Sequence, residues 1–167
     1  MTQALGALRR DDDRCAVRFE RLYDYTAEEL WRALTEPEQI RGWLADVSRF
    51  DLEPDGEVHL HFGDEPDGSQ TTWRVREVEP QRVLECEWNY PGEEPSIVRF
   101  ECHPRERGTL LVLDHRRLSD DEAPGYAAGW HAHLEALANL FATNDDDWYR
   151  RYSELRPVYE EAASALP

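Results

Sequence analysis

Histidine is the side chain of this sequence whose charge changes near neutral pH, and the first pair lies at 59 and 61. Two imidazoles two residues apart on a strand share one face and could bind a metal ion. That face alternates with apolar residues, so we expect His59 and His61 to point to solvent. The apolar residues are Val58, Leu60 and Phe62. The sequence supplies no evident third ligand, and we therefore predict no metal site here.

Three other histidines lie in apolar segments. His115 shares one face of a predicted strand with Leu111 and Leu113. If that face meets the core, the imidazole needs a hydrogen-bond partner. Two interpretations stay open: an ordinary hydrogen-bonded core histidine, or a polar anchor or general base in a ligand pocket. His131 and His133 lie two apart on a predicted helix and face different directions. His133 borders the apolar stripe of that helix, so we expect it to reach the interior and His131 to lie outside.

No motif in the sequence demands catalysis. It has no glycine-rich phosphate loop, no H-E-x-x-H and no G-x-S-x-G, and we assign no catalytic residue, metal or cofactor. The three cysteines lack the spacing of a disulfide framework or a zinc motif. They are Cys15, Cys86 and Cys102, of which the last two read as small buried hydrophobes. This use of cysteine is typical of the reducing cytoplasm.

The charge balance argues against two classes of partner. The 167 residues carry a formal net charge of -17, from 36 Asp and Glu against 19 Lys and Arg. A surface this acidic repels phosphate groups, so we expect neither nucleic acid nor an anionic membrane surface as a partner. The N-terminal residues have no apolar core of a signal peptide, and no segment approaches the length of a membrane span. The sequence therefore predicts a cytoplasmic protein without membrane insertion.

Two capping patterns predict two short helices in series. Thr26 with Glu29 forms an S/T-x-x-E pattern, in which the threonine oxygen accepts from a backbone N–H and the glutamate reaches back. Thr35 with Glu38 repeats the pattern. Pro37 ends the first helix and fits the first turn of the second, where its missing N–H costs nothing.

Alternating apolar residues predict about six to seven strands, and the short links between them predict an antiparallel sheet. The expected strands are 17–23, 50–52, 58–62, 71–78, 83–90, 97–103 and 109–118. A long helix over 126–143 follows, with an apolar stripe at Trp130, Leu134, Leu137 and Phe141. At about 27 Å, this helix is long enough to cross a sheet.

The chain is expected to hold a flexible tail at 1–14, one folded domain at 15–143 and a helical extension at 144–167. Pro157 is expected to kink or split the helix of the extension. Its aromatic residues have three candidate roles, which are to cap a cavity, to pack on the sheet or to form a dimer contact. These residues are Trp148, Tyr149, Tyr152 and Tyr159.

A resemblance to a known family rests on three motifs: AEELWRALTEPEQIRGWL at 27–44, GTLLVLDHRRL at 108–118 and GWHAHLEALANL at 129–140. With WRVREVEPQRVLECEW at 73–88, they resemble the activator-of-Hsp90-ATPase-like proteins of the START-like (Bet v 1-like) superfamily. The resemblance covers roughly residues 14–143. It implies an α+β helix-grip fold, in which a curved antiparallel sheet wraps a long C-terminal helix and two short helices follow the first strand. It also implies a cavity between the sheet and the long helix.

We expect aromatic residues to line this cavity, with histidines as its polar groups. The candidate ligand-binding residues are Trp43, Trp73, Trp88, Tyr90, His115, Trp130 and His133. Trp43, at the end of the helical pair, is expected near the mouth. For each aromatic residue the alternative is ordinary core packing.

Three functions remain open. The leading hypothesis is a protein that binds a hydrophobic or amphipathic small molecule. The resemblance also allows a protein-interaction role, like chaperone co-activation, with a protein partner or a second copy of the chain. The third function is a cyclase-like or hydrolase-like enzyme that uses the same cavity, with acid–base work by His115 together with a cavity carboxylate or tyrosine.

Overall fold

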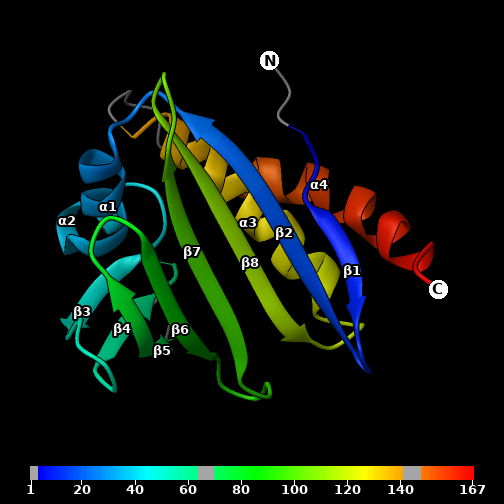
Figure 1. The fold of residues 1–167 in the computed structure, drawn as a ribbon. Coiled ribbons are helices and arrows are strands. Elements are labelled where there is room, and N and C mark those ends of the chain that lie inside the picture. Colours follow the sequence, from blue (N-terminus) through cyan, green and yellow to red (C-terminus); the bar gives the residue numbers. More distant parts are fainter. Residues whose placement is uncertain (1–3, 64–69, 141–147) are drawn as a thin grey trace.

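One antiparallel sheet forms the centre of the molecule in the computed structural model, which describes residues 4–63, 70–140 and 148–167 (Figure 1). The strand order is β1-β2-β8-β7-β6-β5-β4-β3. The strands are β1 (Ala7–Asp11), β2 (Arg14–Tyr23), β3 (Asp46–Phe50), β4 (Glu57–His61), β5 (Gln70–Glu79), β6 (Val83–Asn89), β7 (Ser96–Pro104) and β8 (Thr109–Leu118). The helices are α1 (Ala27–Thr35), α2 (Pro37–Arg41), α3 (Ala123–Ala138) and α4 (Trp148–Ser164). Helices α3 and α4 lie together on one face of the sheet, and α1 and α2 cover one end of it (Figure 1).

The predicted α+β class and antiparallel sheet are confirmed, with eight strands instead of six to seven. The extra strand, β1, corrects the prediction of a flexible tail at 1–14. The aspartate run forms a tight turn, in which Asp12 has a φ of 55°. The chain then returns as β2, which pairs antiparallel with β1. Arg9 of β1 reaches the carboxylate of Asp114 on β8 at 2.8 Å. The two short helices therefore follow the second strand.

The first of the two predicted capping boxes is confirmed and the second is wrong. The Thr26 oxygen accepts from the Glu29 N–H, and the Glu29 side chain accepts from the Thr26 N–H. Thr35 remains inside α1, and its hydroxyl turns back to donate to the Trp31 carbonyl at 2.7 Å. The residue at the N-cap of α2 is Glu36, whose side chain makes no capping hydrogen bond to the backbone of the helix.

Helix α3 starts earlier and ends earlier than predicted. Ser119 and Glu122 bond each other's backbone N–H groups before its first turn, which is the reciprocal pattern of a capping box. The predicted stripe residues Trp130, Leu134 and Leu137 are buried. The helix ends at Ala138. The stripe residue Phe141 and the predicted end at 143 lie outside the described residues. None of the described helices is long and apolar enough to cross a membrane.

Helix α4 packs along α3 and continues through Pro157, so the predicted split does not occur. Its buried residues are Leu155 and Tyr159. The hydroxyl of Tyr159 accepts from the Gly6 N–H at 2.7 Å, which ties the C-terminal helix to the residue before β1. The predicted boundary at 143 and 144 falls outside the described residues, and the division between the domain and its C-terminal extension stays a prediction.

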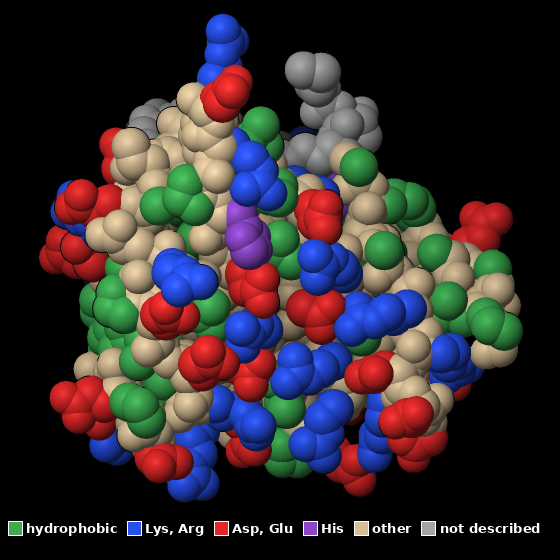
Figure 2. Space-filling model, viewed as in Figure 1, with side chains coloured by type: hydrophobic (Ala, Val, Ile, Leu, Met, Phe, Trp, Pro, Cys, Tyr) green, Lys and Arg blue, Asp and Glu red, His purple; other side chains and the backbone are tan. Residues whose placement is uncertain are grey.

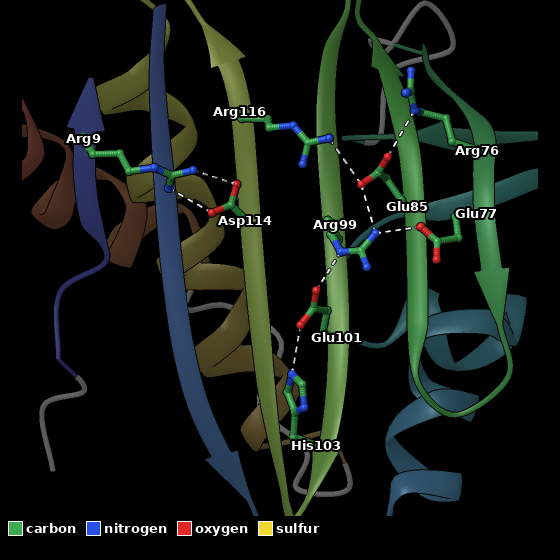
Figure 3. Close-up of polar contacts among 9 residues, drawn as sticks. All are labelled: Arg9, Arg76, Glu77, Glu85, Arg99, Glu101, His103, Asp114 and Arg116. Atoms are coloured by element: carbon green, nitrogen blue, oxygen red, sulfur yellow. Dashed lines mark hydrogen bonds and ion pairs between the residues drawn. The ribbon is translucent and has the colours of Figure 1, made fainter. Parts of the chain in front are cut away.

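The outer face of the sheet is a network of arginines and carboxylates. Figure 2 shows basic and acidic side chains interspersed over this face, and all 19 basic residues of the chain are arginine. The centre is Glu85, only 7% exposed, which accepts from Arg76, Arg99 and Arg116 (Figure 3). Exposed ion pairs contribute little singly, but a shared, buried acceptor couples several of them. Most arginines of this face are therefore already paired within the chain.

The hairpin between β7 and β8 gives a first testable prediction about stability. Gly108 has a φ of 79°, and an added Cβ would overlap the carbonyl oxygen of Tyr23. We expect Gly108→Ala to lower the free energy of unfolding by about 3 kcal/mol, because left-handed strain adds to a backbone clash. Gly92 is the matched control, since its φ is 86° and nothing lies within 4 Å of an added Cβ. Gly92→Ala should cost only about 1 kcal/mol. Urea unfolding measures both, and equal costs would contradict the clash.

Candidate functional site

A pocket of about 480 Å³ lies between α3, α4 and the ends of β4, β5 and β6. Its walls are mostly aromatic. The aromatic lining residues are Phe62, Trp88, Tyr90, Tyr126, Trp130, Trp148 and Tyr152, with His133 beside them. Such a volume and such walls are typical of a site for a small organic molecule.

One end of the pocket is neutral. His133 of α3 lies between Phe62, at 6.0 Å between ring centroids, and Trp148, at 4.9 Å. Its Nδ1 lies 2.9 Å from the Trp43 carbonyl oxygen, which can only accept, so Nδ1 carries the proton. Burial lowers the pKa of His133 to about 4, which keeps the ring neutral. Its Nε2 is therefore an acceptor, and no described residue bonds it.

The same end holds a hydroxyl without a partner. Thr71 lies beside Leu60 in the ladder of β4 and β5, and its side chain is fully buried against the pocket. Its Oγ1 has no hydrogen-bond partner among the described residues, and neither has the indole N–H of Trp148. Buried polar groups normally have partners, so these two point to a missing polar group in the pocket.

The other end of the pocket is charged. Glu93, Asp121 and Glu122 line it together with Arg156. The Tyr126 hydroxyl donates to Glu93 Oε2 at 2.5 Å and accepts from the Trp88 indole at 3.0 Å. Burial raises the pKa of the Glu93 carboxyl and, more strongly, that of the Tyr126 hydroxyl. This end therefore contains a partly buried carboxylate held by a neutral phenol.

Arg156 of α4 is paired with a carboxylate but not fully hydrogen-bonded. Its Nη1 donates to the Tyr152 hydroxyl at 2.9 Å. Its Nε lies 2.9 Å from Glu160 Oε1 as an ion pair, without the geometry of a hydrogen bond. Gly125 of α3 leaves room for this guanidinium, because an added Cβ would lie 3.4 Å from Nη1. One turn later, Gly129 leaves a similar space opposite Trp148. The two glycines thus keep the space between α3 and α4 open.

His115 lies behind the pocket wall and is fully buried. The Trp130 indole N–H donates to its Nδ1 at 2.9 Å, so Nδ1 carries no proton. Nε2 then carries the proton and donates to the Ser96 hydroxyl at 2.7 Å. Burial lowers the pKa of His115 to about 3. Both nitrogens are occupied, which favours the core-histidine interpretation and leaves no free lone pair for a general base.

The structure divides the predicted site residues into two sets. Those that line the pocket are Trp88, Tyr90, Trp130 and His133. Trp43, Trp73 and His115 do not line it. Trp43 is buried away from any mouth, with its indole N–H on the Ala33 carbonyl at 2.9 Å. Trp73 packs behind Trp88, with 6.0 Å between ring centroids. These three residues support the wall from behind.

Of the other histidines, two lie where the sequence predicts and one does not. His59 and His61 lie on the face of β4 opposite its buried residues, as predicted. His131 was expected outside and is fully buried, because α4 covers that side of α3. Its Nδ1 accepts from the Tyr159 hydroxyl at 2.8 Å, and its Nε2 lies 3.3 Å from the Glu135 carboxylate. Within the described ranges, no three His, Cys, Asp or Glu side chains are placed to hold a metal.

Sequence reasoning left the four aromatic residues of the extension open, and they take different places. Trp148 and Tyr152 stack at 5.1 Å between ring centroids and form a pocket wall. Tyr159 is buried against α3 and β2. Tyr149 is 75% exposed. Their spacing was a signal, since 148 and 152 are one helical turn apart.

Other lining residues had weaker signals in the sequence. Glu93 and Thr71 lie in turn-rich or strand-edge segments with no pattern that singles them out. Gly129 could have been noticed, because a glycine inside an apolar helix lowers its stability. Such a glycine usually has a packing or functional reason.

The fold and sequence have clear relatives. CalU16 from Micromonospora echinospora aligns with a TM-score of 0.80 and 24% identity over 98% of this chain and 100% of that one. A protein encoded by gene BPP1335 from Bordetella parapertussis aligns with a TM-score of 0.72 and 29% identity over 96% and 93%. Protein MLL2253 from Mesorhizobium loti aligns with a TM-score of 0.67 and 27% identity over 78% and 99%. No curated protein matches the chain significantly.

A family model matches most of the chain. The model describes the activator of Hsp90 ATPase homolog 1-like protein and covers residues 24–142. This range includes the helical pair, the sheet from β3 to β8 and all of α3. It stops before α4, so Trp148, Tyr152 and Arg156 come from outside the matched part. The chain belongs to the activator of Hsp90 ATPase homolog 1-like family and has its helix-grip fold.

Proposed function

We propose that the protein binds a hydrophobic or amphipathic small molecule in the pocket between α3, α4 and the strand ends. The observation that carries this proposal is the 480 Å³ pocket itself, walled by aromatic side chains in an otherwise packed core. Aromatic faces hold flat apolar ligands, and a few polar atoms orient them.

Two features support an occupied pocket over a packing defect. The partnerless Thr71 hydroxyl and Trp148 indole would gain hydrogen bonds from a polar group of a ligand. Gly129, in the interior of α3, costs about 1 kcal/mol relative to alanine. A chain that keeps it gives up stability and leaves the space opposite Trp148 open, which is a common exchange at functional sites.

The enzyme alternative relied on His115, whose two nitrogens are engaged by Trp130 and Ser96. Its acid–base role therefore loses its physical basis. The co-activator alternative, in which the acidic surface docks a basic protein partner, stays a prediction. Binding of a small molecule is the function that the described contacts favour. A second copy of the chain as partner and a cytoplasmic location stay predictions.

A ligand screen tests this proposal. We expect naphthalene-based and similar apolar probes to raise the thermal midpoint with increasing concentration, because they bind only the folded state. Tryptophan emission should change as well, since Trp88, Trp130 and Trp148 line the pocket. Trp148→Ala should weaken binding at least tenfold by removing the wall over His133.

The matched control is Tyr149→Ala, which removes the adjacent, exposed aromatic of the same helix. This variant should bind the probes as the unchanged protein does. Loss of binding in both variants would place the effect in the folding of α4, and no binding of any probe to the unchanged protein would contradict the proposal.

A further inference from the structure

The charge of the pocket indicates what kind of molecule it takes. Three carboxylates line its charged end, at Glu93, Asp121 and Glu122, against the single cation of Arg156. That cation is already compensated, because Glu160 lies 2.9 Å from its Nε. None of the three carboxylates has an ion-pair partner among the described residues. The charged end therefore carries uncompensated negative charge.

Glu93 differs in this respect from its neighbour in sequence. Glu94 forms an ion pair with Arg14 and is largely exposed. Glu93 is half-buried, and its only described partner is the neutral hydroxyl of Tyr126. A carboxylate removed from water without a cation costs free energy that an incoming cation would recover.

Aromatic faces lie beside these carboxylates. Trp88 bonds the same Tyr126 hydroxyl that holds Glu93, and the two rings meet edge to face at 5.7 Å between centroids. Tyr152 contacts Arg156 at the same end. The negative face of an indole or phenol ring attracts organic cations, and desolvation strengthens this attraction. Carboxylates and π faces together form a site for a cation with an apolar body.

The opposite end of the pocket would take the rest of the molecule. The buried Thr71 hydroxyl has no partner there, and the His133 Nε2 is an unprotonated acceptor. Beside His133 lie the rings of Phe62 and Trp148. This end suits an apolar or aromatic group, and it offers hydrogen bonds to one polar substituent of that group.

We propose that the ligand is an organic cation: an apolar or aromatic body seated against Phe62, His133 and Trp148, with a protonated amine that reaches Glu93 at the charged end. This proposal rests on the proposed small-molecule function and adds the charge of the ligand. The amine binds as the cation, and no covalent step takes place.

Three probes with one ring system and different charge test the proposal. They are naphthylethylamine, which is a cation, naphthylethanol, which is neutral, and naphthylacetate, which is an anion. We expect the amine to bind about tenfold more tightly than the alcohol, and the acetate at least tenfold more weakly than the alcohol, in titrations followed by tryptophan emission. Raising the salt concentration should weaken only the amine.

Variants assign the effect to one carboxylate. Glu93→Gln keeps an oxygen that can accept from Tyr126 and removes the charge, so we expect it to weaken the amine about tenfold and leave the alcohol unchanged. Glu94→Gln removes the neighbouring charge, which Arg14 already compensates, and should leave all three affinities unchanged.

The outcomes separate this inference from the proposed function. If all three probes bind equally well, the pocket binds small molecules and the cation inference is wrong. If the acetate binds most tightly, Arg156 sets the charge preference and the inference is again wrong. If no probe binds, the proposed function itself is contradicted, and the inference falls with it.

Discussion

Lowering the pH from 6.5 to 5 should remove about 3 kcal/mol from the free energy of unfolding, because the buried His115 and the half-buried His133 stay neutral in the folded protein. Burial lowers the pKa of His115 to about 3 and that of His133 to about 4. In the unfolded chain both titrate near 6.5. Below pH 6.5 the unfolded state therefore binds protons that the folded state does not, at about 1.4 kcal/mol per pH unit and histidine. The stabilisation is complete above pH 6.5 and is lost as the pH falls toward 4.

His131 adds to this effect in the same direction. Burial lowers its pKa, and the nearby guanidinium groups of Arg21 and Arg151 lower it further, whereas the carboxylate of Glu135 opposes them. Tyr159, which donates to its Nδ1, is neutral in this range. We therefore expect between two and three protons to be taken up on unfolding at pH 5 to 6.

Urea unfolding at a series of pH values measures this uptake as the slope of the free energy against pH. His115→Gln should reduce the slope by about one proton. Ser96→Ala is the control, because it removes the hydrogen-bond acceptor of His115 and lowers stability, but leaves the neutral buried imidazole and hence the slope. A slope below one proton in the unchanged protein would mean that these imidazoles accept protons in the folded state.

The elements that the sequence predicted well are those whose signals are local. The box at Thr26 and Glu29 marks the start of α1, and the alternation around Val58 and Leu60 marks β4. The stripe through Trp130 and the motifs of the family then place α3 against the sheet. Each of these patterns depends on residues a few positions apart, so one sequence suffices to read it.

The errors have tertiary causes. His131 was placed outside because its position borders the polar side of α3, and only the docking of α4 through Tyr159 buries it. The strand at 7–11 was missed because its pairing depends on a turn at Asp12 and a contact with Asp114 on β8. Trp43 looked like a cavity residue, but its indole bonds the carbonyl of Ala33 inside the core. Long-range packing decides all three cases.

The candidate site was predictable only in part for the same reason. Aromatic residues of β6 and α3 follow from periodicity, and Trp88 and Trp130 indeed line the pocket. Glu93 and Thr71 reach it through the ladder of strands and a turn, which no local pattern encodes. The wall from α4 depends on how two helices pack, and it lies outside the part that the family model matches.

Filling the pocket from α3 should abolish ligand binding while the fold remains. Gly129 lines the pocket, and the nearest atom to an added Cβ is Trp148 Cζ2 at 4.0 Å, which is an ordinary contact. Gly129→Ala should therefore raise the free energy of unfolding by about 1 kcal/mol, because alanine is the better helix former. Gly129→Leu places a branched side chain in the space of the ligand, and we expect at least a hundredfold loss of affinity for naphthylethanol.

Ala138→Leu is the control for added bulk, because Ala138 is an exposed residue of the same helix and does not line the pocket. Its affinity should equal that of the unchanged protein. Thermal midpoints of the variants separate loss of the site from loss of the fold. A binding pocket requires that affinity falls from the unchanged protein to Gly129→Ala and again to Gly129→Leu, because each larger side chain removes more of the pocket volume. The thermal midpoints should stay unchanged or rise, because both residues are better helix formers than glycine. Full affinity in Gly129→Leu would place the ligand elsewhere, because leucine and a two-ring molecule cannot occupy the same space between α3 and α4.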